Sequence, residues 1–167
     1  MTVWGEFATA IARPGPAEGG FVALWHLAEA EIGAPLFTVM TFDPATWMAR
    51  RVWSSMPQDY PPQGSKPMPA SGWADQVLTR QQPYIANSIA EIATHFADHE
   101  LILGLGFESC LNLPVVVSGR VLGTLNCLAG PGHYTAERVT RAARLVAPGA
   151  ICLMRAASET DGKKDKA

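Results

Sequence analysis

The stretch CLNLPVVVSGRVLGTLNCLA occupies residues 110–129. It consists of two apolar runs, 110–117 and 121–129, with Ser118, Gly119 and Arg120 between them. Apolar runs of strand length that a few turn residues separate are typical of two antiparallel strands joined by a tight turn. We therefore expect a β-hairpin here, and it is the clearest strand signal in the chain.

Alternate residues of this hairpin sort into an apolar set and a polar set. Successive side chains of a strand point to opposite faces, so pairing of residues of equal parity keeps each set on its own face. One face then holds Leu111, Leu113, Val115, Val117, Gly123, Leu125 and Cys127, and the other holds Cys110, Asn112, Val116, Thr124 and Asn126. We expect the first face to pack on helices and the second to line a ligand cavity. The alternative is that the two asparagines only bond the backbone of neighbouring loops.

The chain before the hairpin predicts a helix, a second hairpin and a stiff loop. Apolar residues at helical spacing predict a helix over 17–32, and Gly33 follows where a left-handed C-cap would lie. Runs rich in β-branched and aromatic residues predict strands over 36–42 and 47–54, on either side of turn residues. Five prolines within 56–69 exclude a helix and a central strand, so this segment is expected to be a long loop.

Capping residues mark the short helices in the middle of the chain. Ser71, Ser88 and Asp98 are each placed to cap one, and the first of these helices is expected to run to Gln81. A short strand is expected between them, over 84–86.

The C-terminal part predicts one more helix and a tail. Thr135 is expected to cap this helix, in which Pro148 should produce a kink or a break. Residues 158–167 are polar and charged without periodicity, and they predict a disordered tail. The expected organisation is one domain over 1–157, with its core at about 17–156.

Length and charge limit the classes of function. A chain of 167 residues suits one domain, and 48% hydrophobic residues supply enough apolar surface for its core. The net charge of -2, without a basic cluster before the last few residues, argues against a nucleic-acid partner. No apolar run approaches the ~20 residues of a membrane span, so no membrane association is expected.

The N-terminus and the cysteines predict a cytoplasmic protein. Residues 1–12 lack the Lys or Arg and the continuous apolar run of a secretory signal. Cys110, Cys127 and Cys152 form an odd set without C-x-x-C spacing, which suits free thiols in a reducing compartment. No output domain is expected within the chain, so a signal would pass through a partner or through self-association.

The final hairpin resembles the closing hairpin of the GAF domain family. Pro114–Val117, a small turn at Gly119, and Leu122–Asn126 resemble the family pattern P-φ-φ, small turn, G-x-φ-G-x-φ, where φ is apolar. Residues 73–77 and 82–85 are similar to the helix and following strand of many small bacterial GAF proteins. The resemblance implies an α/β (α+β) fold: a central antiparallel sheet, with terminal helices on one face and loops and short helices over a pocket on the other. It also implies a homodimer that forms through the terminal helices.

Three specialised classes of that family differ from this chain. The N-K-x-F-x-D-E signature of the cyclic-nucleotide class is not found in the sequence. No cysteine precedes a His, as it commonly does in the bilin-binding class. The redox cysteines of the free methionine-(R)-sulfoxide reductases cluster upstream of the final hairpin, where this chain has none.

The candidate ligand-binding residues come from the hairpin, the Pro-rich loop and the short helices. They are Tyr60, Lys66, Trp73, His99, Cys110, Asn112, Thr124 and Asn126. Lys66 can hold an anionic group and Trp73 can stack on a flat ligand, or they can be a solvated lysine and a core tryptophan. His95 and His99 with nearby carboxylates imitate a metal site only on one continuous helix, which an Asp98 cap would interrupt. We therefore expect no metal, no cofactor and no catalytic residue.

Together these observations predict a small-molecule-binding sensory domain whose ligand is a small polar or carboxylated metabolite. One alternative is a small enzyme that uses Cys110 with Asn112 and His99, which would need a base and a cation near the thiol. The other is a purely structural dimerisation module whose cavity is filled by side chains.

Overall fold

The computed structural model describes residues 1–164 and has a six-stranded antiparallel sheet in the order β3-β2-β1-β6-β5-β4. The strands are β1 (Leu36–Asp43), β2 (Met48–Ser54), β3 (Lys66–Pro67), β4 (Tyr84–Ala86), β5 (Ser109–Val117) and β6 (Arg120–Ala129). The helical elements are α1 (Val3–Ala12), α2 (Glu18–Ile32), α3 (Gly72–Ala74), the π-helical turn η1 (Asp75–Thr79), α4 (Ile89–Ala93), α5 (His99–Gly104), α6 (Ala136–Ala142), the 3-10 turn η2 (Ala143–Leu145) and α7 (Val146–Lys164).

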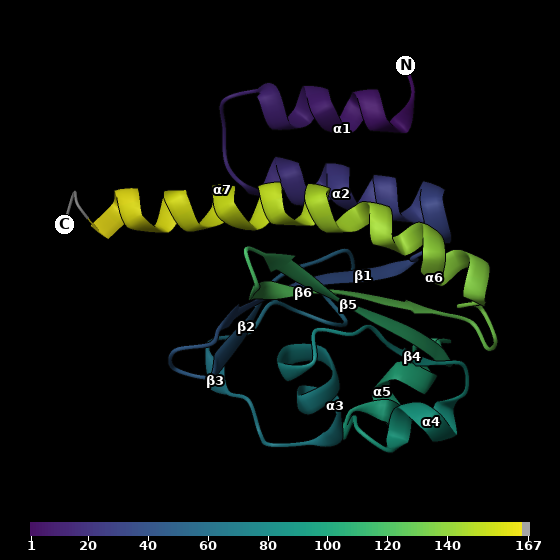
Figure 1. The fold of residues 1–167 in the computed structure, drawn as a ribbon. Helices are drawn as coiled ribbons and strands as arrows, with labels where there is room; N and C mark the ends of the chain where they lie inside the picture. The colour runs from purple at the N-terminus through teal and green to yellow at the C-terminus, as the bar shows by residue number, and fades with distance from the viewer. Residues whose placement is uncertain (165–167) are drawn as a thin grey trace.

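The sheet separates two layers (Figure 1). Helices α1, α2, α6 and α7 lie on one side of it, and α3, α4 and α5 lie on the other. Each side has its own core, one including Leu24 and Leu125 and the other including Val77 and Ile92. The layers confirm the expected α+β fold. Within residues 1–164, no helix combines the length and the hydrophobicity that crossing a bilayer requires.

The register of β5 and β6 confirms the expected separation of faces. Asn112 lies directly opposite Asn126, so residues of equal parity pair along most of the hairpin. The apolar set, including Leu111 and Leu125, belongs to the helix-side core. The polar set therefore faces the layer of short helices and loops.

Two glycines allow the chain to turn and to pack closely in the hairpin. Ser118 and Gly119 both have positive φ, at 50° and 75°, as a two-residue type I′ turn requires. At Gly123 a Cβ would lie 2.0 Å from the carbonyl oxygen of Met40 on β1. Only glycine therefore lets β6 pair with β1 at this position.

Most of the expected helix ends are confirmed. Gly33 ends α2 with φ 69°, and its N–H donates to the carbonyl of Glu29. Ser71, Ser88 and Thr135 each accept a hydrogen bond from the backbone N–H three residues on. These bonds satisfy donors that the first turn of a helix leaves without a partner.

Three elements in the first two thirds of the chain differ from expectation. The sequence pattern indicates no element before residue 17, yet α1 forms there, with Thr2 as its cap and Phe7 buried. The helix expected over 71–81 is α3 followed by η1, and it ends at Thr79. Asp98 precedes α5 but makes no capping hydrogen bond, because its carboxylate accepts a hydrogen bond from the Tyr60 hydroxyl.

The C-terminal helix is interrupted near its start and extends further along the chain than expected. The turn η2 separates α6 from α7, close to Pro148, so the expected break is present. However, α7 continues through Lys164, into the segment predicted as a disordered tail. Ser158 and Thr160 donate their hydroxyls to carbonyl oxygens one turn earlier, so these polar residues fit the helix. Residues 165–167 lie outside the described residues.

Candidate functional site

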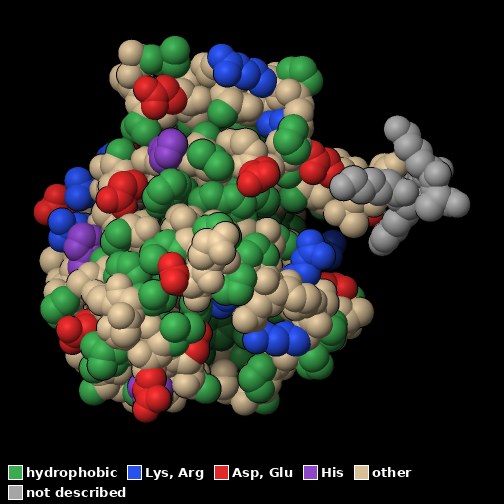
Figure 2. All heavy atoms as spheres, turned by 180° about the vertical axis from the view of Figure 1, so that it is seen from behind, with side chains coloured by type: hydrophobic (Ala, Val, Ile, Leu, Met, Phe, Trp, Pro, Cys, Tyr) green, Lys and Arg blue, Asp and Glu red, His purple; other side chains and the backbone are tan. Residues whose placement is uncertain are grey.

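A cavity of about 410 Å³ lies between the polar face of the sheet and the layer of loops and short helices. Residues from β1, β2, β5 and β6 form its floor, and the Pro-rich loop, α3 and the segment between α4 and α5 form its walls. Seen from behind, the surface is hollowed in its lower half, with Lys and Arg side chains beside the hollow (Figure 2). The volume lies in the ~300–1,000 Å³ range of small-molecule sites.

The structure brings six of the eight candidate residues together around this cavity. They are Tyr60, Lys66, Trp73, Cys110, Asn112 and Asn126. The predicted loop at 56–69 is thus part of the site, and its two-residue strand β3 pairs with the first two residues of β2.

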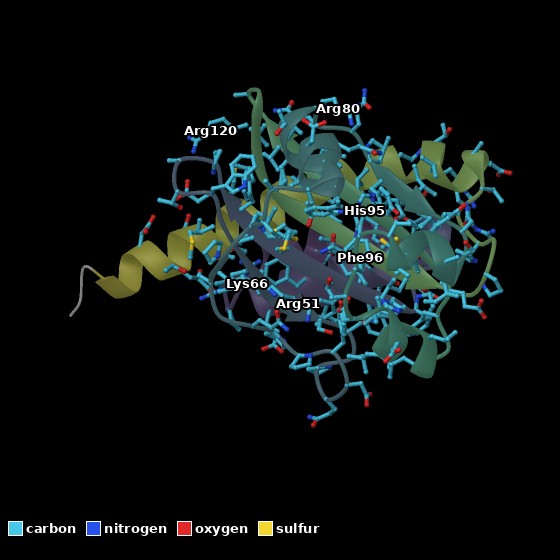
Figure 3. The ribbon with its side chains drawn as sticks, turned by 90° about the horizontal axis from the view of Figure 1, so that it is seen from below. Arg51, Lys66, Arg80, His95, Phe96 and Arg120 are labelled. Carbon is cyan, nitrogen blue, oxygen red and sulfur yellow. The ribbon has the colours of Figure 1, made fainter. Side chains whose placement is uncertain are left out.

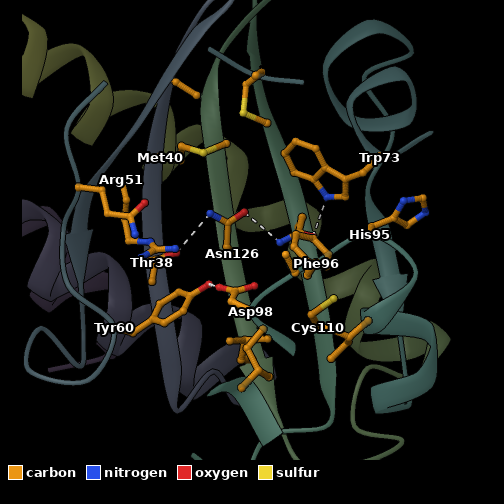
Figure 4. A pocket seen from close by; sticks show the side chains of 18 of the residues that line it. Thr38, Met40, Arg51, Tyr60, Trp73, His95, Phe96, Asp98, Cys110 and Asn126 are labelled. Carbon is orange, nitrogen blue, oxygen red and sulfur yellow. Dashed lines mark hydrogen bonds between the residues drawn. The ribbon is translucent and has the colours of Figure 1, made fainter. Parts of the chain in front are cut away.

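A chain of side-chain hydrogen bonds crosses the floor of the cavity (Figure 4). The indole Nε1 of Trp73 donates to Asn112 Oδ1 at 2.9 Å. Asn112 Nδ2 donates to Asn126 Oδ1 at 3.0 Å, and Asn126 Nδ2 donates to Thr38 Oγ1 at 3.3 Å. The asparagines therefore bond side chains of the site, and not the loop backbone that the alternative interpretation invoked.

Trp73 sets the direction of this chain of bonds. An indole N–H can only donate, so the Asn112 atom facing it has to be the carbonyl oxygen. The Asn112 amide nitrogen then faces Asn126, and the Asn126 amide nitrogen faces Thr38. Within residues 1–164, the second N–H of Asn126 and the hydroxyl hydrogen of Thr38 have no protein acceptor, so both can serve a bound molecule.

Arg51, Tyr60 and Asp98 form a second group in the wall. The guanidinium carbon of Arg51 lies 3.7 Å from the centre of the Tyr60 ring, and its Nη1 donates to the Pro61 carbonyl at 3.0 Å. The Tyr60 hydroxyl donates to Asp98 Oδ2. Burial raises the pKa of Tyr60 above its ordinary value, although Arg51 opposes the shift, so the hydroxyl keeps its proton and remains a donor.

The cationic residues Arg51 and Lys66 and the aromatic residue Phe96 come from different sides of the site. Arg51 and Lys66 lie on the β2–β3 side, whereas His95 and Phe96 lie on the other (Figure 3). Lys66 is exposed and donates to Gln63 Oε1 at 3.2 Å. The Phe96 ring meets Trp73 edge-on, with centroids 6.1 Å apart. The β2–β3 end of the cavity is thus cationic, with Tyr60 beside Arg51, and the end lined by Trp73 and Phe96 is aromatic.

Two candidate residues do not line the cavity. His99 begins α5, and its Nδ1 lies 2.9 Å from the carbonyl oxygen of Phe96. The ring therefore contacts the backbone just before α5 and not the cavity. Thr124 shares the polar face but is fully buried, and its hydroxyl has no hydrogen-bond partner among residues 1–164. It lies beyond the floor, toward the hairpin turn, where η1 packs on β5 and Val77 belongs to the same core as Val121.

Cys110 lines the cavity as a protonated thiol. Its exposed fraction is 2%, and burial raises the pKa of the thiol to about 12. The thiolate that a nucleophile requires is therefore scarce at neutral pH. Because α4 and α5 are separate helices, His95 and His99 do not form the turn of a metal site. Among residues 1–164, no three His, Cys, Asp or Glu side chains are grouped to hold a metal ion.

Thr38, Arg51, Asp98 and Phe96 also line the cavity but are not among the eight candidates from the sequence. Thr38 and Arg51 lie in predicted strands, where the alternation of side chains between the two faces could have assigned them to the cavity. A bulge between β1 and β2 shifts that parity, because Val39 pairs with Trp53 and the next residue pairs with Arg51. Asp98 carries the signal of a helix cap, whereas Tyr60, which donates to its carboxylate, is 38 residues away.

The comparisons with known proteins match the fold just described. A family model described as the GAF domain matches residues 7–154. The GAF domain of an Acinetobacter phosphoenolpyruvate-protein phosphotransferase is 13% identical, with a TM-score of 0.69 and 95% of each chain covered. That of a Coxiella burnetii phosphoenolpyruvate-protein phosphotransferase is 14% identical, with a TM-score of 0.68 and 95% of each chain covered.

A third solved structure belongs to a signalling protein. The GAF domain of a Bacillus halodurans two-component sensor histidine kinase is 11% identical, with a TM-score of 0.67, over 87% of this chain and 97% of that chain. At these identities the likeness shows the fold. A comparison with curated proteins gives no match.

Proposed function

Because this chain belongs to the GAF domain family, whose members commonly bind small molecules, we propose that it is a sensory domain for a small polar or carboxylated metabolite. The ligand occupies the cavity over β1, β5 and β6. The solved relatives from a sensor histidine kinase and from phosphoenolpyruvate-protein phosphotransferases support a regulatory role. The three free, buried cysteines support a location in the cytoplasm.

The hydrogen-bond chain from Trp73 to Thr38 is the observation that carries this proposal. Buried polar side chains need partners, and here the partners leave two donors unused at the floor of an open cavity. Arg51 and Lys66 add positive charge on one side. Donors and cations together suit an oxyanion such as a carboxylate. A dimerisation module with a filled cavity would not need this arrangement.

The terminal helices provide a route for the signal. Ile151 and Met154 on α7 have exposed fractions of 40% and 47%, although both are apolar. We propose that residues 1–157 act as one unit and that this surface forms a homodimer, as the family resemblance implies. Ligand binding would then be read by a partner or by the second copy.

Native mass spectrometry of freshly purified protein tests the proposal. We expect a fraction of the wild-type protein to carry an additional small mass that is released on denaturation. Asn126→Leu should lose that mass because it removes the unused donor and fills the floor. A matched surface variant, Arg80→Gln, should retain it. An additional mass that is equal in wild type and in Asn126→Leu would contradict binding at this site.

A further inference from the structure

One tyrosine holds two opposite charges apart inside the cavity. Arg51 lies against the face of the Tyr60 ring, and Asp98 accepts a hydrogen bond from the hydroxyl at the far end of the same ring. Figure 4 shows Tyr60 reaching across the site toward Asp98. The cation and the anion thus line one cavity, with the cation over the centre of the Tyr60 ring and the anion at its hydroxyl.

The two charges do not neutralise each other. Within residues 1–164, the ion pairs with N–O distances up to 4.0 Å are Arg80 with Asp75 and Arg144 with Glu31. Neither pair belongs to the cavity. Asp98 is the only carboxylate among the residues that line the cavity, and its Oδ1 accepts no hydrogen bond from the described residues. A half-buried charge without a charged partner favours a ligand that supplies one.

A purely anionic ligand would satisfy only half of this site. Arg51 and Lys66 would attract it, but the carboxylate of Asp98 would repel it at short range. A purely cationic ligand would be attracted by Asp98 but repelled by Arg51 and Lys66. A molecule with an anionic and a cationic group a few bonds apart satisfies both.

From this geometry, and on the basis of the proposed function, we infer that the ligand is a free α-amino acid. Its carboxylate is bound by Arg51 together with the unused donors of Thr38 and Asn126. Its ammonium group donates to Asp98. Its side chain extends toward the aromatic end of the cavity, beside Phe96. A cavity of about 410 Å³ is large enough for the larger natural side chains.

Thermal melts of the wild-type protein with each of the twenty standard L-amino acids provide the first test. At least one should raise the melting temperature. The best of them is then compared by isothermal titration calorimetry with two analogues of the same side chain, the carboxylic acid without the amino group and the amine without the carboxylate. Each analogue should bind about 10- to 100-fold more weakly, because each loses one charge-assisted contact.

Variants assign each contact to its residue. Asp98→Asn can still accept the Tyr60 hydrogen bond, so it should fold normally and bind the amino acid no better than the amino-free acid. Arg51→Gln should abolish the preference for the amino acid over the amine. The exposed pair Arg80 and Asp75 lies outside the cavity, so Arg80→Gln and Asp75→Asn are matched charge controls that should bind normally.

The outcomes separate this inference from the proposed function. The inference is overturned if no amino acid shifts the melting temperature, or if the amino-free acid binds as tightly as the amino acid. In either case, a different small molecule found by native mass spectrometry and lost in Asn126→Leu would leave the proposed function standing. Failure of both measurements would reject both.

Discussion

At the scale of single residues, Asn112 connects the fold to the site. Its side chain is 6% exposed, and its two polar ends are used by Trp73 and Asn126. Such a group stabilises only while both partners are present, because an unsatisfied buried donor or acceptor costs about 1–3 kcal/mol. Asn126 is half-buried and one step closer to solvent. The two asparagines should therefore respond differently to the same substitution.

Asn112→Leu should lower the melting temperature by several degrees. It leaves the Trp73 indole N–H and Asn126 Oδ1 without their Asn112 partner. An unsatisfied buried group costs about 1–3 kcal/mol, and each kcal/mol lowers the melting temperature by roughly 2–4 °C in a domain of this size. Thermal melts of Asn112→Leu, Trp73→Phe and the double variant measure the coupling. The double variant should lose less stability than the sum of the single variants. Strict additivity would show that the indole hydrogen bond contributes nothing.

Cys110 should resist alkylation at neutral pH. Its thiol is buried, and burial raises its pKa to about 12, so the reactive thiolate forms only in strongly alkaline solution or after unfolding. Intact-mass measurements with iodoacetamide at about pH 7 should show slow modification in native protein and rapid modification in denaturant. Fast native labelling that Cys110→Ser removes would restore the Cys-dependent enzyme as an interpretation.

At the scale of elements, local signals were sufficient for the sheet and insufficient for the site. The hairpin, its two faces and the caps at Ser71, Ser88 and Thr135 follow from patterns within a few residues. Asp98 also carries a local capping signal, but a distant tyrosine competes for its carboxylate. Local sequence indicates which hydrogen bonds a side chain can make, and contacts from distant parts of the chain determine which of them forms. That is why the floor of the site was predictable and its charged wall was not.

One such tertiary contact joins the end of the N-terminal helix to α7. Arg155 on α7 donates to the carbonyls of Ala10, Ile11, Arg13 and Gly15, and so caps the C-terminal end of α1. Arg155→Gln removes the fork geometry and should increase hydrogen exchange across α1, while the exchange of β5 and β6 stays slow. Arg80→Gln is the control, since Arg80 is exposed and pairs with Asp75 on η1, on the other side of the sheet from α1. Unchanged exchange in α1 would show that its packing on α2 holds it without the arginine.

At the scale of the whole molecule, burial of thiols and phenols should make the fold sensitive to alkali. Burial raises the pKa of Cys110 and Cys152 to about 12, and it also raises the pKa of Cys127 and Tyr134. In an unfolded chain these groups ionise at about 8.5 for Cys and about 10 for Tyr. Above about pH 8.5 the folded state then holds more protons than the unfolded state. The contribution of these groups to the free energy of unfolding is fully present below about pH 8.5 and is lost as the pH rises toward their folded-state pKa values.

Melting temperatures measured from about pH 7 to pH 11 should therefore fall progressively above about pH 8.5. Cys127→Ala should make the decline shallower, because it removes one buried thiol. A constant melting temperature across this range would mean that the thiols ionise as readily in the folded protein as in the unfolded chain.

The proposed homodimer is a second property of the whole molecule. Sedimentation equilibrium at ~50 μM should give the mass of two chains, since interfaces of standard size commonly bind far more tightly than this concentration requires. Met154→Glu places a charge on the exposed apolar face of α7 and should give a monomer with an unchanged melting curve. A monomer mass for the wild-type protein would exclude the dimer.

The Trp73 indole N–H provides the most direct test of the claim that this cavity binds a small molecule. In ¹H–¹⁵N spectra each tryptophan gives one indole signal, and Trp73→Phe identifies the one from the site. Adding the low-molecular-weight fraction of a cell extract to ¹⁵N-labelled protein should shift the Trp73 signal, because its acceptor Asn112 lines the cavity. The signals of Trp4, Trp25, Trp47 and Trp53, which do not line the cavity, should stay in place. An unmoved Trp73 signal in the presence of saturating extract would contradict the account.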